Sequence, residues 1–127
     1  MLIYCVECKQ NVDAKLVTGK EVYPHRTDLY NLLFYKCPTC GGFVGTHKAD
    51  DRPLGCIPTP ALKRARMGVH NRMDKLWRSG KIKRTDLYNR ISKEIGYEYH
   101  NGETRSVEEC NTALNIISKI ENELRFN

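Results

Sequence analysis

Two C-x-x-C pairs, Cys5/Cys8 and Cys37/Cys40, constrain the fold of this chain more than any other feature. A C-x-x-C turn brings two sulfur atoms to one ion, and four thiolates complete the tetrahedral shell that Zn²⁺ prefers in structural sites. We therefore predict one structural Zn²⁺ bound by these four cysteines. Iron or a redox-active dithiol is the alternative.

Gly41 and Gly42 follow the second pair and suit a tight knuckle, because glycine tolerates positive φ and lets backbone N–H groups approach the thiolates. Four thiolates leave no open position for water, so we do not expect catalysis at the metal. His47 and His25 are redundant as ligands and are expected to pack or hydrogen-bond near the site. His47 could replace a cysteine only if the register differs.

The other two cysteines are isolated, and the six together could form a disulfide framework in a secreted protein. Closely spaced pairs without a secretory signal instead favour a metal site in a reducing cytoplasm. Cys56 then becomes a free thiol and Cys110 a small buried hydrophobic residue. No apolar run approaches the ~20 residues that cross a bilayer, so no membrane association is expected.

The first third of the chain has the pattern of β-structure. The predicted β segments are a hairpin over 16–23 with Thr-Gly-Lys at its turn, a strand over 31–37 and a strand over 42–47. Short strands with two cysteine knuckles make residues 1–50 a three-stranded zinc ribbon. Residues 51–59, rich in Pro, Gly and Asp, form a linker.

Residues 60–127 are predicted to form a basic three-helix region packed on the ribbon, which makes the fold class α+β. The first helix begins at Pro60 after the cap Thr59 and stops at Ser79-Gly80. The second runs from the cap Thr85 to Gly96. The third opens with a capping box that starts at Ser106.

Basic charge is concentrated in the middle of the chain. The formal balance is +1 for residues 1–59, +8 for 60–95 and −3 for 96–127. Clustered lysines and arginines can track a phosphate backbone, although such helix faces are also ordinary solvated surface. The predicted nucleic-acid-binding residues, for DNA or RNA, are Lys63, Arg64, Lys75, Arg78, Lys81, Lys83 and Arg84.

Three further side chains have competing interpretations. His70 and Asp74 lie four residues apart on one helix and could orient an imidazole for catalysis, or simply form a hydrogen-bonded pair. Trp77 could anchor a partner protein or belong to the core. Around His100 nothing supports an active site, and no nucleophile and base constellation is found.

The order of these motifs resembles a family of uncharacterised phage and prophage proteins described as zinc-finger-containing. The matching segments are the first C-x-x-C, "LFYKCPTCGGFVGTH" (33–47), "RPLG" (52–55), "LKRARMGVHNRMDKLW" (62–77) and "RTDLYNRIS" (84–92). The resemblance implies a zinc ribbon joined to a helical region, a phage or prophage origin and action in a bacterial host cell. It implies no activity. The chain has "EYHNG" at 98–102 where relatives tend to carry a cysteine before the histidine, so no role is carried over to His100.

The sequence thus predicts a non-enzymatic, zinc-binding accessory protein that binds nucleic acid. A protein-interaction module that modulates a host factor is the alternative. A hydrolase or nuclease that uses His70 and Asp74 is a third option. The sequence does not indicate an oligomeric state.

Overall fold

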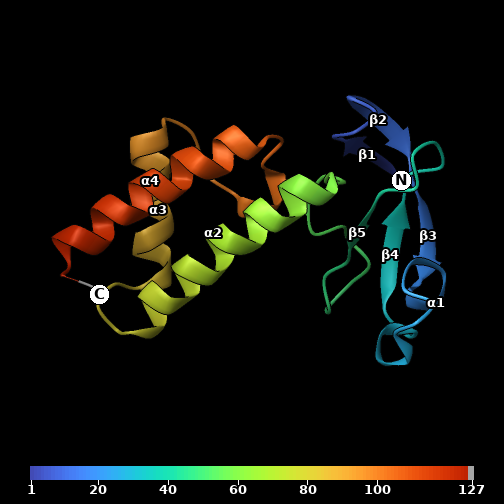
Figure 1. Cartoon of the computed structure of the whole chain (residues 1–127), viewed down its shortest axis with the longest axis horizontal. Helices are drawn as coiled ribbons and strands as arrows, with labels where there is room; N and C mark the ends of the chain where they lie inside the picture. Colours follow the sequence, from blue (N-terminus) through green and yellow to red (C-terminus); the bar gives the residue numbers. More distant parts are fainter. Residues whose placement is uncertain (126–127) are drawn as a thin grey trace. The chain divides into compact units, whose positions relative to one another are not determined.

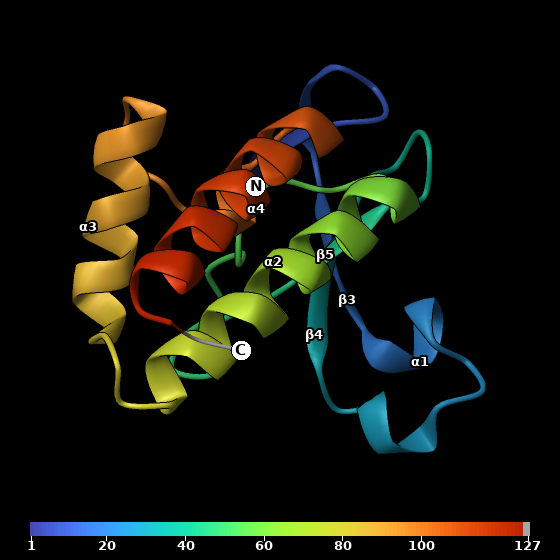
Figure 2. The same cartoon turned by 60° about the vertical axis from the view of Figure 1, so that its left-hand side comes forward.

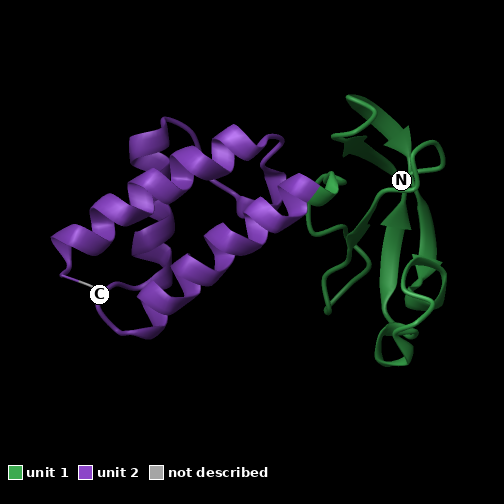
Figure 3. Ribbon diagram, in the orientation of Figure 1, with its two compact units in different colours: residues 1–60 green, residues 61–127 purple. Residues whose placement is uncertain are grey.

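The computed structural model describes residues 1–125, with short strands followed by helices (Figure 1). The chain divides into two compact units, residues 1–60 and 61–127 (Figure 3). Residues 126 and 127, which end the predicted basic helical region, lie outside the described part. The α+β class predicted from the sequence is confirmed, with small antiparallel sheets and four helices.

The strands of the first unit form two antiparallel sheets. Their bounds are β1 Leu2–Cys5, β2 Gln10–Asp13, β3 Lys15–Thr18, β4 Leu33–Lys36 and β5 Phe43–Gly45. β1 pairs with β2, a hairpin that the sequence did not predict, and β4 lies between β3 and β5. The register places Tyr35 opposite both Leu16 and Val44, so these side chains share one face of the second sheet.

One face of this sheet contributes to the core of the first unit. The buried core residues are Ile3, Cys5, Val12, Ala14, Tyr35, Cys37, Val44 and Ile57. On the other face Tyr23, Phe34 and Phe43 pack edge to face, with ring centroids 5.2–5.6 Å apart. Because two predicted zinc ligands belong to the buried set, the cysteine cluster and the hydrophobic core are parts of one structure.

The predicted hairpin over 16–23 is wrong. β3 ends at Thr18, its partner is β4, and the short helix α1 occupies Gly19–Val22. A Cβ on the buried Gly19 would lie only 1.7 Å from the carbonyl oxygen of Leu29. This glycine therefore permits two backbone segments to approach each other rather than making a hairpin turn. A short 3-10 helix, η1 (Thr27–Leu29), leads on towards β4.

The second unit is built from three long helices, α2 Pro60–Arg78, α3 Arg84–Ile95 and α4 Val107–Glu123. In both views α2 and α4 lie side by side and run in the same direction (Figures 1 and 2). The guanidinium of Arg72 on α2 donates to Ser118 Oγ (2.8 Å) and pairs with Glu121, both on α4. With α1, residues 1–125 contain four α-helices where the sequence predicted three.

α2 and α3 both end at or just before the glycines that the sequence predicted as their stops. α2 begins at Pro60 and ends before Gly80, which has a φ of 82°. α3 ends at Gly96, whose φ of 93° allows its N–H to donate to the carbonyl of Ser92 (3.0 Å). The prediction of Thr85 as the N-cap of α3 is wrong. Lys83 has the extended conformation of the N-cap, and its carbonyl accepts from the N–H of Leu87.

Ser106 is the N-cap of α4, as the sequence predicted: its Oγ accepts from the N–H of Glu109 at 3.2 Å. Ser106→Ala is expected to lower the free energy of unfolding by about 1 kcal/mol, because the N–H of Glu109 loses its hydrogen-bond acceptor. Urea unfolding followed by circular dichroism measures the change. Asn115→Ala, at an exposed position inside the same helix, is the control and should not destabilise the protein. Equal stability of Ser106→Ala and the wild type would contradict the cap.

All three long helices contribute to the core of the second unit. The buried apolar residues are Leu62, Val69, Met73, Leu76, Leu87, Ile91, Tyr99, Cys110, Ala113, Ile117 and Ile120. The segment between α3 and α4, which includes the 3-10 helix η2 (Asn101–Glu103), is held by polar contacts to α2. Arg66 Nε donates to Thr104 Oγ1 (3.1 Å), and Asn101 Nδ2 donates to the carbonyl of Arg66 (3.0 Å). Arg66 is therefore a structural residue of this unit.

Within residues 1–125, no helix has both the length and the apolar character needed to cross a membrane.

Candidate metal centre

The four cysteines of the two pairs come together in the first unit. Cys5 is the last residue of β1 and Cys8 lies in the turn that follows, while Cys37 follows β4 and Cys40 lies in the turn before β5. Their Sγ atoms all lie within 4.8 Å of one another. Two strand ends with their turns therefore bring four sulfur donors to one place.

The spacing of the sulfur atoms fits a tetrahedral thiolate site. The Sγ atoms of Cys5 and Cys40 are 3.5 Å apart, and those of Cys8 and Cys37 are 3.7 Å apart. Four Zn–S bonds of about 2.3 Å in a tetrahedron place neighbouring sulfurs about 3.8 Å apart. A disulfide would require about 2.05 Å. The donors, their number and their separations all suit Zn²⁺, and the cysteine cluster indicates zinc binding.

The two knuckles have the same backbone design. The N–H of Lys9 donates to the carbonyl of Cys5 (2.8 Å), and the N–H of Gly41 donates to that of Cys37 (3.1 Å). Both donors have positive φ, 56° for Lys9 and 77° for Gly41. Lysine rarely adopts this conformation, so the knuckle geometry is imposed by the fold at that position. No sequence signal at Lys9 revealed this equivalence.

The prediction of positive φ is correct for Gly41 and wrong for Gly42. Gly42 instead permits a close approach, since a Cβ there would lie 3.1 Å from Ile57 Cγ2 and 3.3 Å from Cys40 Sγ. Its N–H donates to Cys40 Sγ at 3.4 Å. The second glycine therefore keeps space for a sulfur atom and supplies it with a hydrogen bond.

Cys5, Cys8 and Cys37 differ in how readily their thiols lose a proton. Burial alone would raise the pKa of Cys37, but hydrogen bonds from the N–H groups of Cys40 and Thr39 and from neighbouring thiols lower it to about 7. Burial, followed by hydrogen bonding with Cys37, raises the pKa of Cys8 to about 12. The pKa of Cys5 is also raised, chiefly by burial. Because zinc binds thiolates, it must displace protons here, and its apparent affinity should increase with pH.

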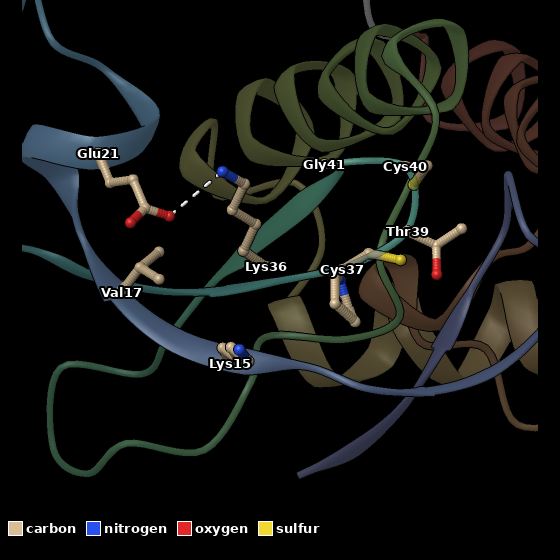
Figure 4. A pocket seen from close by; sticks show the side chains of 9 residues that line it. Lys15, Val17, Glu21, Lys36, Cys37, Thr39, Cys40 and Gly41 are labelled. Carbon is tan, nitrogen blue, oxygen red and sulfur yellow. Dashed lines mark hydrogen bonds and ion pairs between the residues drawn. The ribbon is translucent and has the colours of Figure 1, made fainter.

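A pocket of about 570 Å³ lies beside the second knuckle, within the first unit (Figure 4). Lys15 and Lys36 line it and are directly opposite each other on β3 and β4. Lys36 Nζ is 3.2 Å from Glu21 Oε2 on α1. Lys36 is thus compensated by Glu21, whereas Lys15 would offset part of the negative charge of a thiolate cluster.

The remaining cysteines and histidines stay outside the cluster. Cys56 is buried in the first unit, and Cys110 is fully buried in the second, 3.7 Å from Thr104 Oγ1. Among the described residues, the sulfur cluster includes no histidine. His47 is exposed, and its backbone N–H donates to the carbonyl of Arg52 (2.9 Å).

The basic residues singled out in the sequence fall into two groups in the second unit. Lys63, Arg64, Lys75 and Arg78 are exposed on α2. Within residues 1–125, Arg64 and Lys75 form no ion pair. Arg78 lies over the ring of Trp77, 5.2 Å from its centroid.

The other basic residues of that prediction lie at or near helix ends. Lys81 Nζ donates to the carbonyls of Leu124 (3.3 Å) and Arg125 (3.2 Å), so it caps the C-terminus of α4. Lys83 is the N-cap of α3, and Arg84 lies over the ring of Tyr88, 4.9 Å from its centroid. Structural contacts therefore hold Lys81 and Arg84. On the exposed face of α2, Arg64 and Lys75 are the cations without an ion pair among the described residues.

Asp74 is the centre of a small polar cluster on α2. Its Oδ2 is 3.2 Å from His70 Nε2 and 3.8 Å from Arg78, and its Oδ1 accepts from Trp77 Nε1 at 3.1 Å. One carboxylate thus serves three neighbouring donors on the same helix. The pairing of His70 with Asp74 predicted from their spacing is present, and the indole of Trp77 shares the carboxylate. His100 is exposed, with its Nε2 3.3 Å from Glu98.

Comparison with known proteins gives one match. A family profile described as a zinc-finger-containing domain matches residues 1–120. No curated protein and no solved structure matches the chain.

Proposed function

The chain belongs to this family of zinc-finger-containing domains, and on that premise we propose that it is a zinc-stabilised, non-enzymatic accessory protein that binds nucleic acid. The first unit would be a zinc ribbon and the second a three-helix region that presents the binding surface. A phage or prophage origin and action in the cytoplasm of a bacterial host belong to the proposal. They rest on the resemblance described for the sequence.

One Zn²⁺ per chain is proposed, with Cys5, Cys8, Cys37 and Cys40 as its ligands. Four clustered sulfur donors support this stoichiometry, because they complete the shell of a structural site by themselves. The ion would supply folding energy and no chemistry. Nothing in the cluster provides an open position for a substrate.

The observation that carries the nucleic-acid proposal is the exposed basic face of α2. The helix contains six basic residues and one acidic residue. Arg66 and Arg72 are engaged with Thr104 and α4 inside the second unit. Arg64, Lys75 and Arg78 are exposed, and Arg78 lies beside Asp74 and Trp77. Exposed cations on one helix face can neutralise successive phosphates.

The triple variant Arg64→Ala, Lys75→Ala, Arg78→Ala tests this surface. Wild-type protein should bind labelled duplex DNA, single-stranded DNA or RNA with an affinity that falls steeply with salt. Because each phosphate contact contributes about 0.9 to the salt slope on duplex DNA, the variant should lose about 2 to 3 units of slope. Fluorescence anisotropy between low and moderate salt measures both quantities.

A matched control removes the same charge from exposed lysines elsewhere: Lys20→Ala, Lys48→Ala, Lys93→Ala. This control should retain most of the wild-type affinity and slope. Equal losses in both triple variants would mean that total charge, and not the α2 face, governs binding. Thermal unfolding of each variant shows whether the fold survives.

A protein-interaction module is the second candidate, and Trp77 is the observation that favours it. The indole is half-buried, hydrogen-bonded to Asp74 and covered by Arg78, so it presents a rigid aromatic and cationic pair. Binding of a partner protein that persists at high salt and is lost in Trp77→Ala, with the fold intact, would favour this candidate over nucleic acid.

A further inference from the structure

Gly68 lies in the middle of α2, eight residues after its first residue and ten before its last. Glycine is less favourable inside a helix than any residue except proline, because it loses the most backbone entropy on folding. A glycine in the interior of a helix costs about 1 kcal/mol relative to alanine.

Nothing in the described chain requires a glycine at this position. A Cβ on Gly68 would meet no atom within 4 Å, and its φ is not in the left-handed region. Gly19 and Gly42 in the first unit differ, since a Cβ on either would lie within 3.3 Å of another atom. Gly68 is exposed, and alanine would fit there without strain.

Most neighbours of Gly68 on the exposed side of α2 are basic or polar, and Met67 beside it is an exposed apolar residue. Arg64 lies four residues before it, Asn71 three after and Lys75 seven after, a spacing that puts all four on one face. With Arg78 the row extends about 21 Å along the helix at a rise of 1.5 Å per residue. All five residues are exposed. The basic face therefore has a gap at its middle, where the helix backbone is bare.

We propose that the phosphodiester backbone of a nucleic acid crosses α2 at Gly68, between Arg64 and Lys75. The inference rests on the proposed function and adds the place and closeness of contact. Without a side chain, the strand can approach the helix backbone, and the flanking cations then reach phosphates on both sides of the crossing. The Asn71 amide can donate to a phosphate oxygen at the same place.

The positive charge of this row of residues favours a nucleic acid over a second protein helix. Arg64, Lys75 and Arg78 are complementary to phosphates, and only Asp74 on α2 carries an opposite charge. That carboxylate contacts His70, Trp77 and Arg78. Arg64 and Lys75, which flank Gly68, form no ion pair among the described residues. A second helix packing on the bare glycine is the competing occupant, and it would not need the cations.

The test compares Gly68→Ala and Gly68→Gln with the wild type on the zinc-loaded full chain. Both substitutions improve helix propensity, so the melting temperature of each should increase by a few degrees. Affinity for the best-bound oligonucleotide should fall about threefold for Ala and tenfold or more for Gln. The salt slope should stay unchanged, because no cation is removed. Asn111→Ala on α4 is the control: it should also stabilise its helix and leave affinity unchanged.

Opposite changes in stability and affinity would support the crossing at Gly68. Stabilised variants that bind as tightly as the wild type would overturn it and leave the proposed function in place. Variants that melt lower, or that change the oligomeric state in gel filtration, would overturn it in favour of packing against protein. If the wild type binds no oligonucleotide at low salt, the proposed function fails first and this inference fails with it.

Discussion

Removal of zinc with a strong chelator is expected to unfold residues 1–60 while residues 61–125 stay helical. The core of the first unit has eight buried residues, and two of them are the proposed ligands Cys5 and Cys37. A unit of about 60 residues with so small a core rarely folds without a metal or disulfides. Structural zinc sites in small fingers supply about 10–16 kcal/mol at neutral pH, more than such a core can replace.

The second unit should resist chelation because it has its own core, with fully buried residues such as Leu76, Leu87 and Ile117 on its three helices. Far-UV circular dichroism should therefore keep most of its helical signal after chelation. The amide resonances of residues 1–60 should collapse to the narrow dispersion of an unfolded chain. Readdition of one equivalent of Zn²⁺ should restore them.

Cysteine variants separate the ligands from the other thiols. Cys37→Ser should abolish stoichiometric zinc binding and reproduce the effect of chelation on the wild type. Cys56→Ala is the matched control, because Cys56 is equally buried in the first unit but lies outside the cluster. It should still bind one equivalent of zinc. Native-like resonances from residues 1–60 without metal would refute a folding role for zinc.

The sequence predicted features whose cause is local. The spacing within each C-x-x-C pair predicts a knuckle. Ser106 predicts a helix start, because its hydroxyl accepts from an N–H group three residues later. Prediction failed where the reason is distant. Gly19 is needed because Leu29 passes beside it, and no period in the sequence records that approach. The contact of Arg66 with Thr104, 38 residues away, likewise leaves no mark in the sequence.

Prediction of the functional residues shows the same difference between local and distant causes. Four cysteines are rare and chemically specific, so their number and spacing were enough to propose the ligand set before any geometry. The surface cations are common residues, and their availability depends on tertiary partners. Only the structure separates Lys81, held by the carbonyls of Leu124 and Arg125, from Lys75, which has no ion pair within the described residues.

Tyr99 is the largest fully buried side chain among the described residues, and Tyr99→Ala is expected to destabilise the second unit by about 3–5 kcal/mol. The side chain is 1% exposed, and its hydroxyl donates to Asn101 Oδ1 at 2.8 Å. Its backbone N–H donates to Ser92 Oγ at 2.9 Å. Truncation leaves a cavity and also frees the segment that joins α3 to α4. Urea unfolding, monitored by helical circular dichroism, measures the loss.

Tyr99→Phe distinguishes the ring from the hydroxyl. It keeps the packing and removes one hydrogen bond, so it should cost only about 1 kcal/mol at neutral pH. A loss as large as that of Tyr99→Ala would show that the hydroxyl network, and not packing, dominates. Tyr97→Phe is the control, because Tyr97 is 48% exposed and its hydroxyl makes a long bond to Glu109 (3.3 Å).

The wild type and Tyr99→Phe should also differ in how their stability depends on alkaline pH. Burial raises the pKa of Tyr99 above its ordinary value of 10, so the unfolded chain loses this proton at a lower pH than the folded chain does. The folded state therefore loses stability as pH rises above 10, by up to about 1.4 kcal/mol per pH unit from this group. Tyr99→Phe removes that contribution, so its free energy of unfolding should fall less steeply with pH than that of the wild type. Parallel stability curves for the two proteins between pH 9 and 11 would contradict a buried, neutral Tyr99.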